Sequence, residues 1–491
     1  MKKRMHQIEL FMKYPHDVQE EWLRKLILSA RNTEWGKKYD YASIQSYNSF
    51  ASRVPLNEYP DLEPYVERMR KGEQNLLWSS EITWMAKSSG TTSHKSKFIP
   101  VSEESLEECH FKGGKDLLSI YCNNNPDTQI FNGKLLGMGG SHFPDNPEAG
   151  TMVGDVSAII MENLPSWVEL MRTPDLSIAM MSEWEEKIDQ IARITSKENV
   201  TNITGVPSWT LVLLKHILEI TGKKSIVEVW PNLELFIHGG VSFVPYRTQF
   251  ANIIGKPINY LETYNASEGF FGIQDRSEAD DMLLMLDYGI FYEFIPLSDE
   301  GKGNPEPIPL HQVETGKNYA MVITTNSGLW RYQIGDTITF TDTDPYRIKI
   351  TGRTRTFINA FGEEVIEDNA LKALDQACEK TGALINEFTA APVYFDQGKN
   401  GAHEWLIEFE KEPEDLNVFG EALDEALQSL NSDYEAKRYR NMVLNNPVIR
   451  VLPKGTFYQW LKNRDRLGGQ YKIPRLSNNR NHLEEILQTL T

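Results

Sequence analysis

Short β-rich runs alternate with amphipathic helical stretches through most of this chain, from about residue 84 to residue 350. Strands that are separated by helical stretches are typical of an α/β architecture, in which helices flank β-sheets. The pattern therefore predicts an α/β fold whose main part is a large N-terminal domain. The β-rich runs cover residues 129–138, 233–238, 320–325 and 337–341, and one helical stretch covers residues 209–221.

The pattern changes after Arg353, where a smaller domain is expected. A helical segment over residues 364–380 is followed by strand-like runs over residues 391–395 and 403–409, and then by a helix over residues 414–430. This order predicts a small α+β domain of about 130 residues, which is within the usual size range for a domain.

A turn signal at residues 342–345, Asp-Thr-Asp-Pro, lies close to the boundary between these two parts. We expect an N-terminal domain over residues 1–350 and a C-terminal domain over residues 357–491. Apolar residues at roughly helical spacing predict a helix over residues 8–31. A chain of 491 residues is too long for one hydrophobic core, which agrees with this division.

The overall charge excludes some classes of partner. The chain has a formal net charge of −18 and a pI near 5.1, so it lacks the basic surface expected for binding nucleic acid or an anionic membrane. No stretch approaches the roughly 18 uninterrupted apolar residues that a membrane-spanning helix needs. An acidic chain can still bind ATP, because a phosphate site needs only local donors and a metal ion.

The N-terminus and the cysteines predict a cytoplasmic location. The chain begins with basic residues, as signal peptides do, but charged and polar residues interrupt the apolar run that should follow. The three cysteines, Cys109, Cys122 and Cys378, are too few for a disulfide framework and lack metal-ligand spacing.

The strongest local signal is the segment at residues 87–97, in which Ser, Thr and Gly predominate and Lys95 and Lys97 end the run. Such a loop offers backbone N–H groups, hydroxyls and a cation to a polyphosphate, and its glycine lets the backbone approach closely. It is not a Walker A loop, because the G-x-x-x-x-G-K-[ST] spacing is absent. The alternative is a polar surface loop.

Residues 260–269 form a second candidate segment, in which a strand-like run leads into a turn with a hydroxyl, a carboxylate and a glycine. Glu268 is suited to hold Mg2+, which prefers carboxylate and phosphate oxygens, and Tyr264 could stack on a base. Taken alone, the segment is better explained as a capped turn with one solvated glutamate.

Three shorter segments complete the set. Asp336 follows a glycine and could accept hydrogen bonds from both hydroxyls of a ribose; an ordinary turn is the alternative. Arg353 lies in a basic run at residues 351–355, which an interdomain linker would explain equally well. Lys472 lies between Tyr471 and a proline-containing turn, and an ordinary surface lysine is the alternative.

The order of these segments resembles the acyl-adenylate-forming superfamily: Ser-Ser-Gly-Thr-Thr, Tyr-x-x-Ser-Glu-Gly, Tyr-x-x-Gly-Asp, Gly-Arg and a C-terminal lysine. Within it, the chain resembles the auxin-responsive acyl-acid-amido synthetases, which are plant hormone-conjugating enzymes with bacterial relatives. The resemblance runs from about residue 8 to residue 476. The segments that favour this family are residues 32–39, 97–100, 266–272 and 470–475.

The resemblance implies a nucleotide site. Lys97 would close the phosphate loop as a catalytic cation, Glu268 would hold Mg2+, and Tyr264 would cover adenine. Asp336 would hold the ribose, and Arg353 would also contact the nucleotide. The other residues implied in binding ATP or AMP are Ser88, Ser89, Gly90, Thr91 and Thr92 of the phosphate loop, Gly239, Gly240 and Val241 beside adenine, and Ala266 and Ser267.

The same resemblance implies a reaction in two steps, with ATP and Mg2+ as cofactors. The carboxylate of a small acid attacks the α-phosphate to give acyl-AMP and pyrophosphate, and the amine of an amino acid then displaces AMP. Lys472, on a mobile C-terminal domain, would stabilise charge during adenylation. That domain would rotate between the steps about a hinge at residues 351–356, with Arg355 or Thr356 as the hinge residue.

The acyl pocket is the least defined part. A helix that begins near Trp209 resembles one that lines the acyl site in relatives, and Phe243 and Val244 could border the same pocket. Trp209 is also a good core residue at helical spacing. The residues leave open which acid and amino acid are used, and also the oligomeric state. Two other functions stay open: a coenzyme A ligase of the same superfamily, and a nucleotide-binding protein without catalytic activity.

Overall fold

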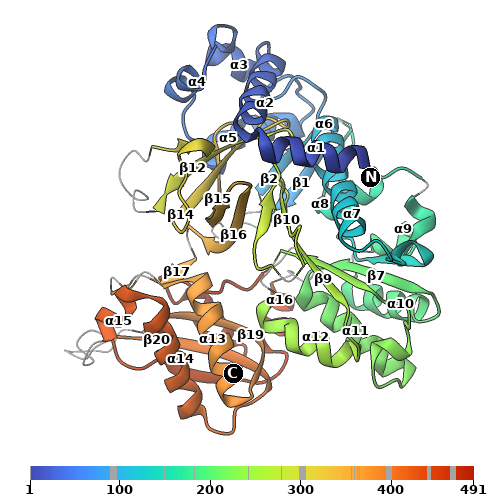
Figure 1. The fold of residues 1–491 in the computed structure, drawn as a ribbon, viewed down its shortest axis with the longest axis vertical. Coiled ribbons are helices and arrows are strands. Elements are labelled where there is room, and N and C mark those ends of the chain that lie inside the picture. The colour runs from blue at the N-terminus through green and yellow to red at the C-terminus, as the bar shows by residue number, and fades with distance from the viewer. Residues whose placement is uncertain are drawn as a thin grey trace. The chain divides into compact units, whose positions relative to one another are not determined.

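The computed structural model describes two compact units, which Figure 1 shows within one chain. The first comprises Met1–Val206, Leu213–Gly240 and Ile258–Lys349, and the second comprises Pro207–Val212, Val241–Pro257 and Ile350–Thr491. The described residues are 2–88, 97–148, 150–166, 168–181, 183–240, 243–277, 279–297, 306–354, 356–358, 360–361, 363, 365–393, 401–438, 444–464 and 472–490.

The largest element is a 12-stranded sheet, nearly all of it in the first unit, whose parallel and antiparallel halves meet between β9 and β10. Hairpins build the antiparallel half, whereas parallel neighbours need longer crossovers. The strands in spatial order are β13 (Ile308–Pro309), β12 (Ile290–Pro296), β14 (Asn318–Thr325), β15 (Tyr332–Thr343), β16 (Tyr346–Arg353), β11 (Met282–Leu284), β10 (Gly269–Ile273), β9 (Asn259–Ala266), β8 (Leu235–Gly239), β7 (Val200–Gly205), β3 (Lys134–Gly137) and β6 (Arg172–Thr173).

A second, four-stranded sheet in the first unit holds the ends of the expected phosphate loop. Its strands in spatial order are β2 (Lys97–Val101), β1 (Trp84–Ser88), β5 (Thr151–Gly154) and β4 (His142–Asn146). Helix α5 (Tyr59–Arg70) precedes the first strand. The helices that connect later strands are α6 (Glu103–Ser105), α7 (Lys112–Asn124), α8 (Val156–Glu162), α9 (Leu176–Ala179), α10 (Trp184–Thr195), α11 (Pro207–Thr221) and α12 (Arg247–Ile254).

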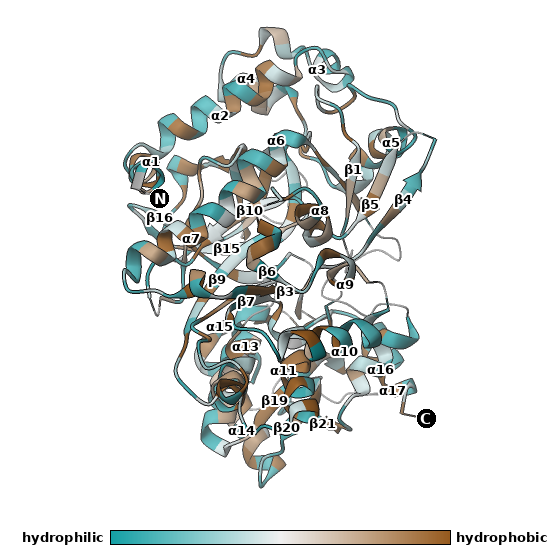
Figure 2. Cartoon of the chain, turned by 90° about the vertical axis from the view of Figure 1, so that its right-hand side faces the viewer, coloured by the Kyte–Doolittle hydropathy of each residue, from teal (hydrophilic) through white to brown (hydrophobic). Residues whose placement is uncertain are grey.

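The predicted helix over residues 8–31 is two helices, α1 (Lys2–Lys13) and α2 (Pro15–Ala30). Pro15 causes the break, because proline has no backbone N–H and disfavours helical geometry in the residue before it. Its fixed φ suits the first position of α2. In Figure 2 both α2 and α7 carry hydrophilic and hydrophobic residues along their length, as expected for helices with one buried face. Two short helices follow, α3 (Glu34–Lys38) and α4 (Tyr47–Arg53).

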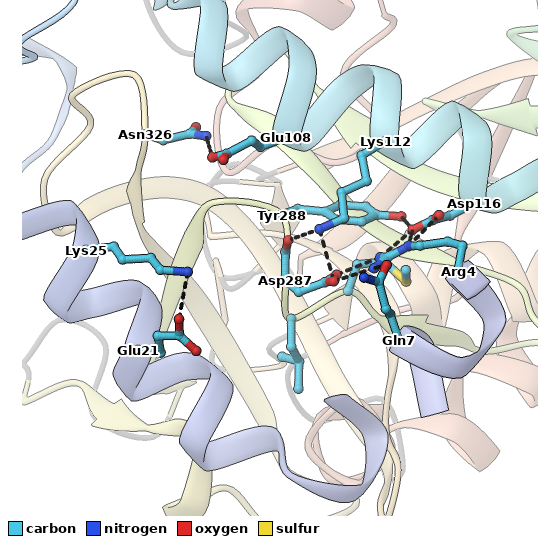
Figure 3. Close-up of polar contacts among 12 residues, drawn as sticks. Arg4, Gln7, Glu21, Lys25, Glu108, Lys112, Asp116, Asp287, Tyr288 and Asn326 are labelled. Atoms are coloured by element: carbon cyan, nitrogen blue, oxygen red, sulfur yellow. Dashed lines mark hydrogen bonds and ion pairs between the residues drawn. The ribbon is translucent and has the colours of Figure 1, made fainter. Parts of the chain in front are cut away.

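A buried ionic network attaches α1 to the first unit (Figure 3). The guanidinium of Arg4 donates to both carboxylate oxygens of Asp116 on α7 and to both oxygens of Asp287, at 2.6–2.9 Å. Tyr288 donates to Asp116 at 2.7 Å, and the Lys112 ammonium lies 3.0 Å from the Asp287 carboxylate. Because Asp116 is fully buried, its charge depends on these partners.

The second unit is an α+β arrangement, as predicted, with a three-stranded sheet in the order β19–β20–β21. The predicted helix over residues 364–380 begins later, at Glu367, because Val365 and Ile366 form strand β18. Residues of α13, α14, β19 and β20 share one hydrophobic core. The elements are β17 (Phe357–Ile358), β18 (Val365–Ile366), α13 (Glu367–Thr381), β19 (Leu384–Val393), β20 (Ala402–Lys411), α14 (Leu416–Leu430), α15 (Ser432–Arg438), β21 (Val448–Leu452), α16 (Thr456–Asn463) and α17 (Asn481–Gln488).

The search for membrane spans was negative: among the residues described above, none of the helices combines the length and the apolar character that crossing a bilayer requires.

Replacing Arg4 by Met should destabilise the protein by about 3 kcal/mol at pH 7, because it leaves buried carboxylates without their cation. Burial alone would raise the pKa of Asp287, but the hydrogen bonds from Arg4 and the charges of Lys112 and Arg4 hold it below its usual 3.8. A lowered carboxylate pKa stabilises the fold above pH 3.8 and ceases to do so as the group protonates. In urea unfolding, the difference in the free energy of unfolding between Arg4→Met and the wild type should therefore become smaller as the pH falls below about 4.

The exposed Arg24 of α2 provides the control, since Arg24→Met should change stability by less than about 0.5 kcal/mol. An Arg4→Met variant as stable as the wild type at pH 7 would contradict the assignment of this network as the attachment of α1.

Candidate active site

The ends of two paired strands hold the expected phosphate loop. Ser88 ends β1, Lys97 begins β2, and these two residues are direct partners in the antiparallel register. The pairing sets where the chain leaves the sheet and where it returns. The loop residues Ser89, Gly90, Thr91 and Thr92 lie outside the described residues.

Lys97 lies among aromatic side chains. Its Nζ is 3.5 Å from the hydroxyl of Tyr332 and 5.9 Å from the ring centre of Tyr59, which is within the range of a cation–π interaction. Burial raises the pKa of Tyr59 to about 12, so its phenol stays neutral near the ammonium. Lys97 therefore lies against the start of β15, the strand that also carries Asp336.

The sequence reasoning assigned no role to Tyr332 or Tyr59. Tyr332 is the first residue of the Tyr-x-x-Gly-Asp segment, so that motif could have identified it as a site residue. Tyr59 lies in α5, 38 positions before Lys97, and no local pattern connects the two residues.

Tyr264 and Asp336, expected at adenine and ribose, are in direct contact. The Tyr264 hydroxyl on β9 donates to Oδ2 of Asp336 on β15 at 2.6 Å, although the residues are 72 positions apart. Both are buried, with 5% and 6% of their surface exposed. The Tyr264 ring also packs against Phe271, with ring centres 4.8 Å apart. The residues expected at adenine and at ribose, which lie on β9 and β15, are therefore next to each other.

Ser267 and Glu268 form the two-residue turn of the β9–β10 hairpin, because Ala266 and Gly269 pair directly. Both turn residues have 8% of their surface exposed, so the solvated glutamate considered in the sequence analysis is not what the structure shows. A Cβ at Gly269 would lie 2.8 Å from Cδ1 of Ile290, which explains the glycine at this position. The turn thus presents a hydroxyl and a carboxylate from a closely packed hairpin.

Gly239 ends the parallel strand β8, and Gly240 follows it. A Cβ at Gly239 would lie 2.5 Å from the carbonyl oxygen of Thr263 on the neighbouring β9. Gly240 has a φ of 81°, which other residues rarely adopt. Close packing against β9 therefore requires glycine at position 239, and the backbone conformation favours it at position 240, while Val241 lies outside the described residues.

The remaining expected residues belong to the second unit. Arg353 ends β16, and its carbonyl accepts from the backbone N–H of Thr356 at 3.0 Å, while Arg355 lies outside the described residues. Trp209 is buried next to Tyr458, with ring centres 6.4 Å apart. Phe243 is buried against Phe250, with ring centres 5.3 Å apart, and Val244 is 38% exposed.

Lys472 is half-buried and lies just before a segment that is attached to β19. Thr389 donates to the carbonyl of Pro474 at 2.6 Å. Arg475 forms an ion pair with Glu387 and donates to the carbonyl of Phe388 at 3.2 Å. The backbone position of Lys472 is therefore determined by the sheet of the second unit.

Three family models match the chain in consecutive order. The GH3 family N-terminal domain matches residues 4–258, the central domain residues 283–353, and the C-terminal domain residues 368–481. The first of these models covers more than half of the 491 residues.

Curated relatives match nearly the whole chain. The indole-3-acetic acid-amido synthetase GH3.4 of Arabidopsis thaliana is 24% identical, over 95% of this chain and 90% of that protein. The jasmonoyl–L-amino acid synthetase JAR4 of Nicotiana attenuata is 25% identical, over 96% and 92%. The 4-substituted benzoates-glutamate ligase GH3.12 of Arabidopsis thaliana is 23% identical, over 93% and 92%.

Solved structures show the same fold. The GH3.15 acyl acid amido synthetase superposes with a TM-score of 0.80 over 99% of this chain and 96% of that one, at 17% identity. A 2-hydroxyisobutyryl-CoA ligase in its postadenylation state gives a TM-score of 0.60 over 96% and 91%, at 13% identity. These matches confirm both the fold class and the resemblance found in the sequence. The chain belongs to the GH3 family, whose relatives named above are amido synthetases and an amino acid ligase.

Proposed function

We propose that this protein is an ATP-dependent acyl-acid amido synthetase. It activates a small carboxylic acid as acyl-AMP with release of pyrophosphate, and it transfers the acyl group to the amine of an amino acid. The observation that carries this proposal is that one compact unit contains the phosphate-loop ends at Ser88 and Lys97, the Tyr264–Asp336 pair and the turn with Glu268. The names of the curated relatives support an amino acid as the acceptor.

The proposed chemistry requires stabilisation of negative charge. When a carboxylate attacks the α-phosphate of ATP, charge concentrates on the phosphoryl oxygens, and positioned donors and cations supply most of the acceleration. Lys97 provides a cation at the end of the phosphate loop, and its aromatic neighbours limit the positions that it can take. Asp336, whose Oδ2 accepts from Tyr264, is the carboxylate that we assign to the ribose.

Glu268 fits a magnesium site that the substrate completes. The described part of the chain contains no group of three or more His, Cys, Asp or Glu side chains arranged to hold a metal ion. Magnesium in nucleotide enzymes usually takes one or two carboxylates and completes its shell with phosphates and water. Glu268, in the β9–β10 turn, is the carboxylate that we assign to it, and the ion would neutralise phosphate charge.

Lys472 is the proposed mobile cation of the first step. We propose that the domain over residues 357–491 rotates between the two steps about a hinge at residues 351–356, so that Lys472 is present for adenylation and withdrawn for amide formation. We also propose that the reaction takes place in the cytoplasm, on the basis of the cysteine pattern.

The assay of function is pyrophosphate release with ATP and Mg2+ over a panel of aromatic and aliphatic acids. Each acid is tested alone, with the twenty amino acids and with coenzyme A. We expect release that increases with one amino acid and a product with the mass of an amide. Preferential thioester formation would instead indicate a coenzyme A ligase, the activity of the neighbour with TM-score 0.60. ATP binding without release on any acid would indicate a protein that binds nucleotide without turnover.

Lys472→Ala should lower the rate of adenylation about 100-fold or more, because it removes a charge that acts on the transition state. The fold should stay intact, and thermal unfolding would check this. Lys380→Ala is the matched control, since Lys380 is an exposed lysine of the same unit, 2.8 Å from Glu425. Adenylation at the wild-type rate in Lys472→Ala would refute the assigned role.

Asp336→Asn and Tyr264→Phe should both weaken ATP binding, to different degrees. Asp336→Asn removes the charge proposed to hold the ribose, so KM for ATP should rise about tenfold or more. Tyr264→Phe removes only the 2.6 Å hydrogen bond that orients Asp336, so a rise of about threefold to tenfold is expected. Steady-state kinetics with ATP as the varied substrate would test both, and an unchanged KM in Asp336→Asn would contradict the ribose assignment.

A further inference from the structure

The turn over residues 138–141 lies directly beyond the carboxyl end of strand β3. In the parallel half of the large sheet β3 neighbours β7, β7 neighbours β8, and β8 neighbours β9. The register pairs Gly137 with Thr204, and Gly239 with Thr263, so the turn is at the same edge as the glycines expected beside adenine. Ligands of open α/β sheets bind beyond the carboxyl ends of the strands.

A buried lysine from α10 holds this turn. Lys187 has only 2% of its surface exposed, and its ammonium donates to the carbonyl of Gly139 and, at 3.4 Å, to that of Gly140. Burial lowers the pKa of Lys187 to about 8, and the nearby carboxylate of Asp155 opposes this shift. A buried ammonium is costly unless its donors are bonded, and the carbonyls of the turn supply acceptors for Lys187.

The start of α8 holds the turn from the other side. The backbone N–H of Ser141 donates to Oδ2 of Asp155 at 3.1 Å, and the N–H of Asp155 donates to the carbonyl of Ser141 at 3.0 Å. The N–H of Gly140 donates to the hydroxyl of Ser157 at 3.0 Å. The polar backbone groups of the turn are thus bonded to two helices.

The two glycines let the turn pack directly on its supports. A Cβ at Gly140 would lie 1.8 Å from Oδ2 of Asp155, and a Cβ at Gly139 would lie 2.8 Å from Sδ of Met161. The glycines thus place the backbone of the turn directly against the side chains of Asp155 and Met161, so displacement of Lys187 or Asp155 would be transmitted to that backbone.

Asp155 also connects the turn to the strand that enters the phosphate loop. Burial raises its pKa, and the hydrogen bond from Ser141 and the charges of Lys87 and Lys187 oppose that rise. Lys87 is the residue before Ser88 on β1, and β1 pairs in parallel with β5, which ends immediately before Asp155. One carboxylate therefore interacts with the supports of both the turn and the phosphate loop.

We propose that Lys187 and Asp155 are positioning residues that hold the Met138–Ser141 turn as a wall of the acyl-acid subsite. This inference rests on the proposed function. The strand order is β9, β8, β7, β3. Since we assign the nucleotide to the ends of β8 and β9, we place the acid, which must reach the α-phosphate, next along the sheet at β7 and β3. Met138 is half-buried, and its adaptable apolar side chain suits the hydrocarbon part of a carboxylic acid.

The test is a comparison of KM values in variants of the full-length protein, measured with an acid found in the panel above. Lys187→Met should raise KM for the acid about tenfold to a hundredfold, because a small displacement of a positioning group is sufficient for such a loss. KM for ATP should change less than about threefold, and Lys187→Arg, which keeps the charge and the donors, should recover part of the loss. Lys134→Met is the control. Lys134 lies on β3, the strand that leads into the turn, but it forms a half-exposed ion pair with Glu198.

Asp155→Asn provides a second route if Lys187→Met fails to fold in thermal unfolding. It keeps an acceptor for the Ser141 N–H but removes the charge between the two lysines, and it should raise KM for the acid in the same way. Equal increases in both KM values in Lys187→Met, or an unchanged KM for the acid in either variant, would overturn the inference.

Hydrogen exchange separates this inference from the proposed function. If the wild type turns over no acid, the proposed function fails, yet the amides of Gly140 and Ser141 should still exchange faster in Lys187→Met than in wild type. Unchanged exchange over residues 137–142 in the folded variant would show that Lys187 does not position the turn.

Discussion

The β9–β10 hairpin is the element on which the arrangement of the site depends. It joins the parallel half of the large sheet to the antiparallel half, so the strand order on either side is built outward from it. The carboxyl ends of the parallel strands all lie at one edge of the sheet, where open α/β sheets bind ligands. The hairpin contacts β15 through the hydrogen bond between Tyr264 and Asp336. Its turn carries Ser267 and Glu268, and its first strand carries Tyr264, which binds Asp336.

A buried ion pair fixes the start of β15 independently of any ligand. Arg331 has a positive φ of 42°, which is uncommon for a residue other than glycine, and its guanidinium binds the buried Glu293 on β12. The same guanidinium donates to the carbonyls of Ala51 and Val54 near the end of α4. Such a network satisfies a charge that could not otherwise stay buried. The next residue, Tyr332, contacts Lys97, so the N-terminal helices contribute to the position of the cation that we propose for the phosphate loop.

The two sheets carry different parts of the proposed site. The four-stranded sheet supplies the phosphate-loop ends through β1 and β2, and the large sheet supplies the expected nucleotide residues through β8, β9 and β15. Asp155 follows a strand of the small sheet and bonds to a turn that follows a strand of the large one. Substrate selection would therefore depend on contacts that no single strand provides.

The sequence by itself determined the fold class, the family and several of the regular elements. The helix over residues 209–221 is α11 with its start at Pro207, and the strands around residues 320–325 and 403–409 are β14 and β20. Such elements are set by local periodicity, which is visible in one sequence. The helix over residues 8–31 was predicted without its break, although Pro15 was the signal for it.

Only the tertiary structure decided which residues meet. Tyr264 binds Asp336 across 72 positions, Lys97 reaches Tyr332 across 235, and Lys187 holds Gly139 across 48. The burial of Glu268 and Lys187 was equally invisible, since in the sequence each is a charged residue of a kind that is usually exposed. The physical reason is that periodicity specifies which face of an element is buried, whereas strand order and crossovers decide which element covers that face.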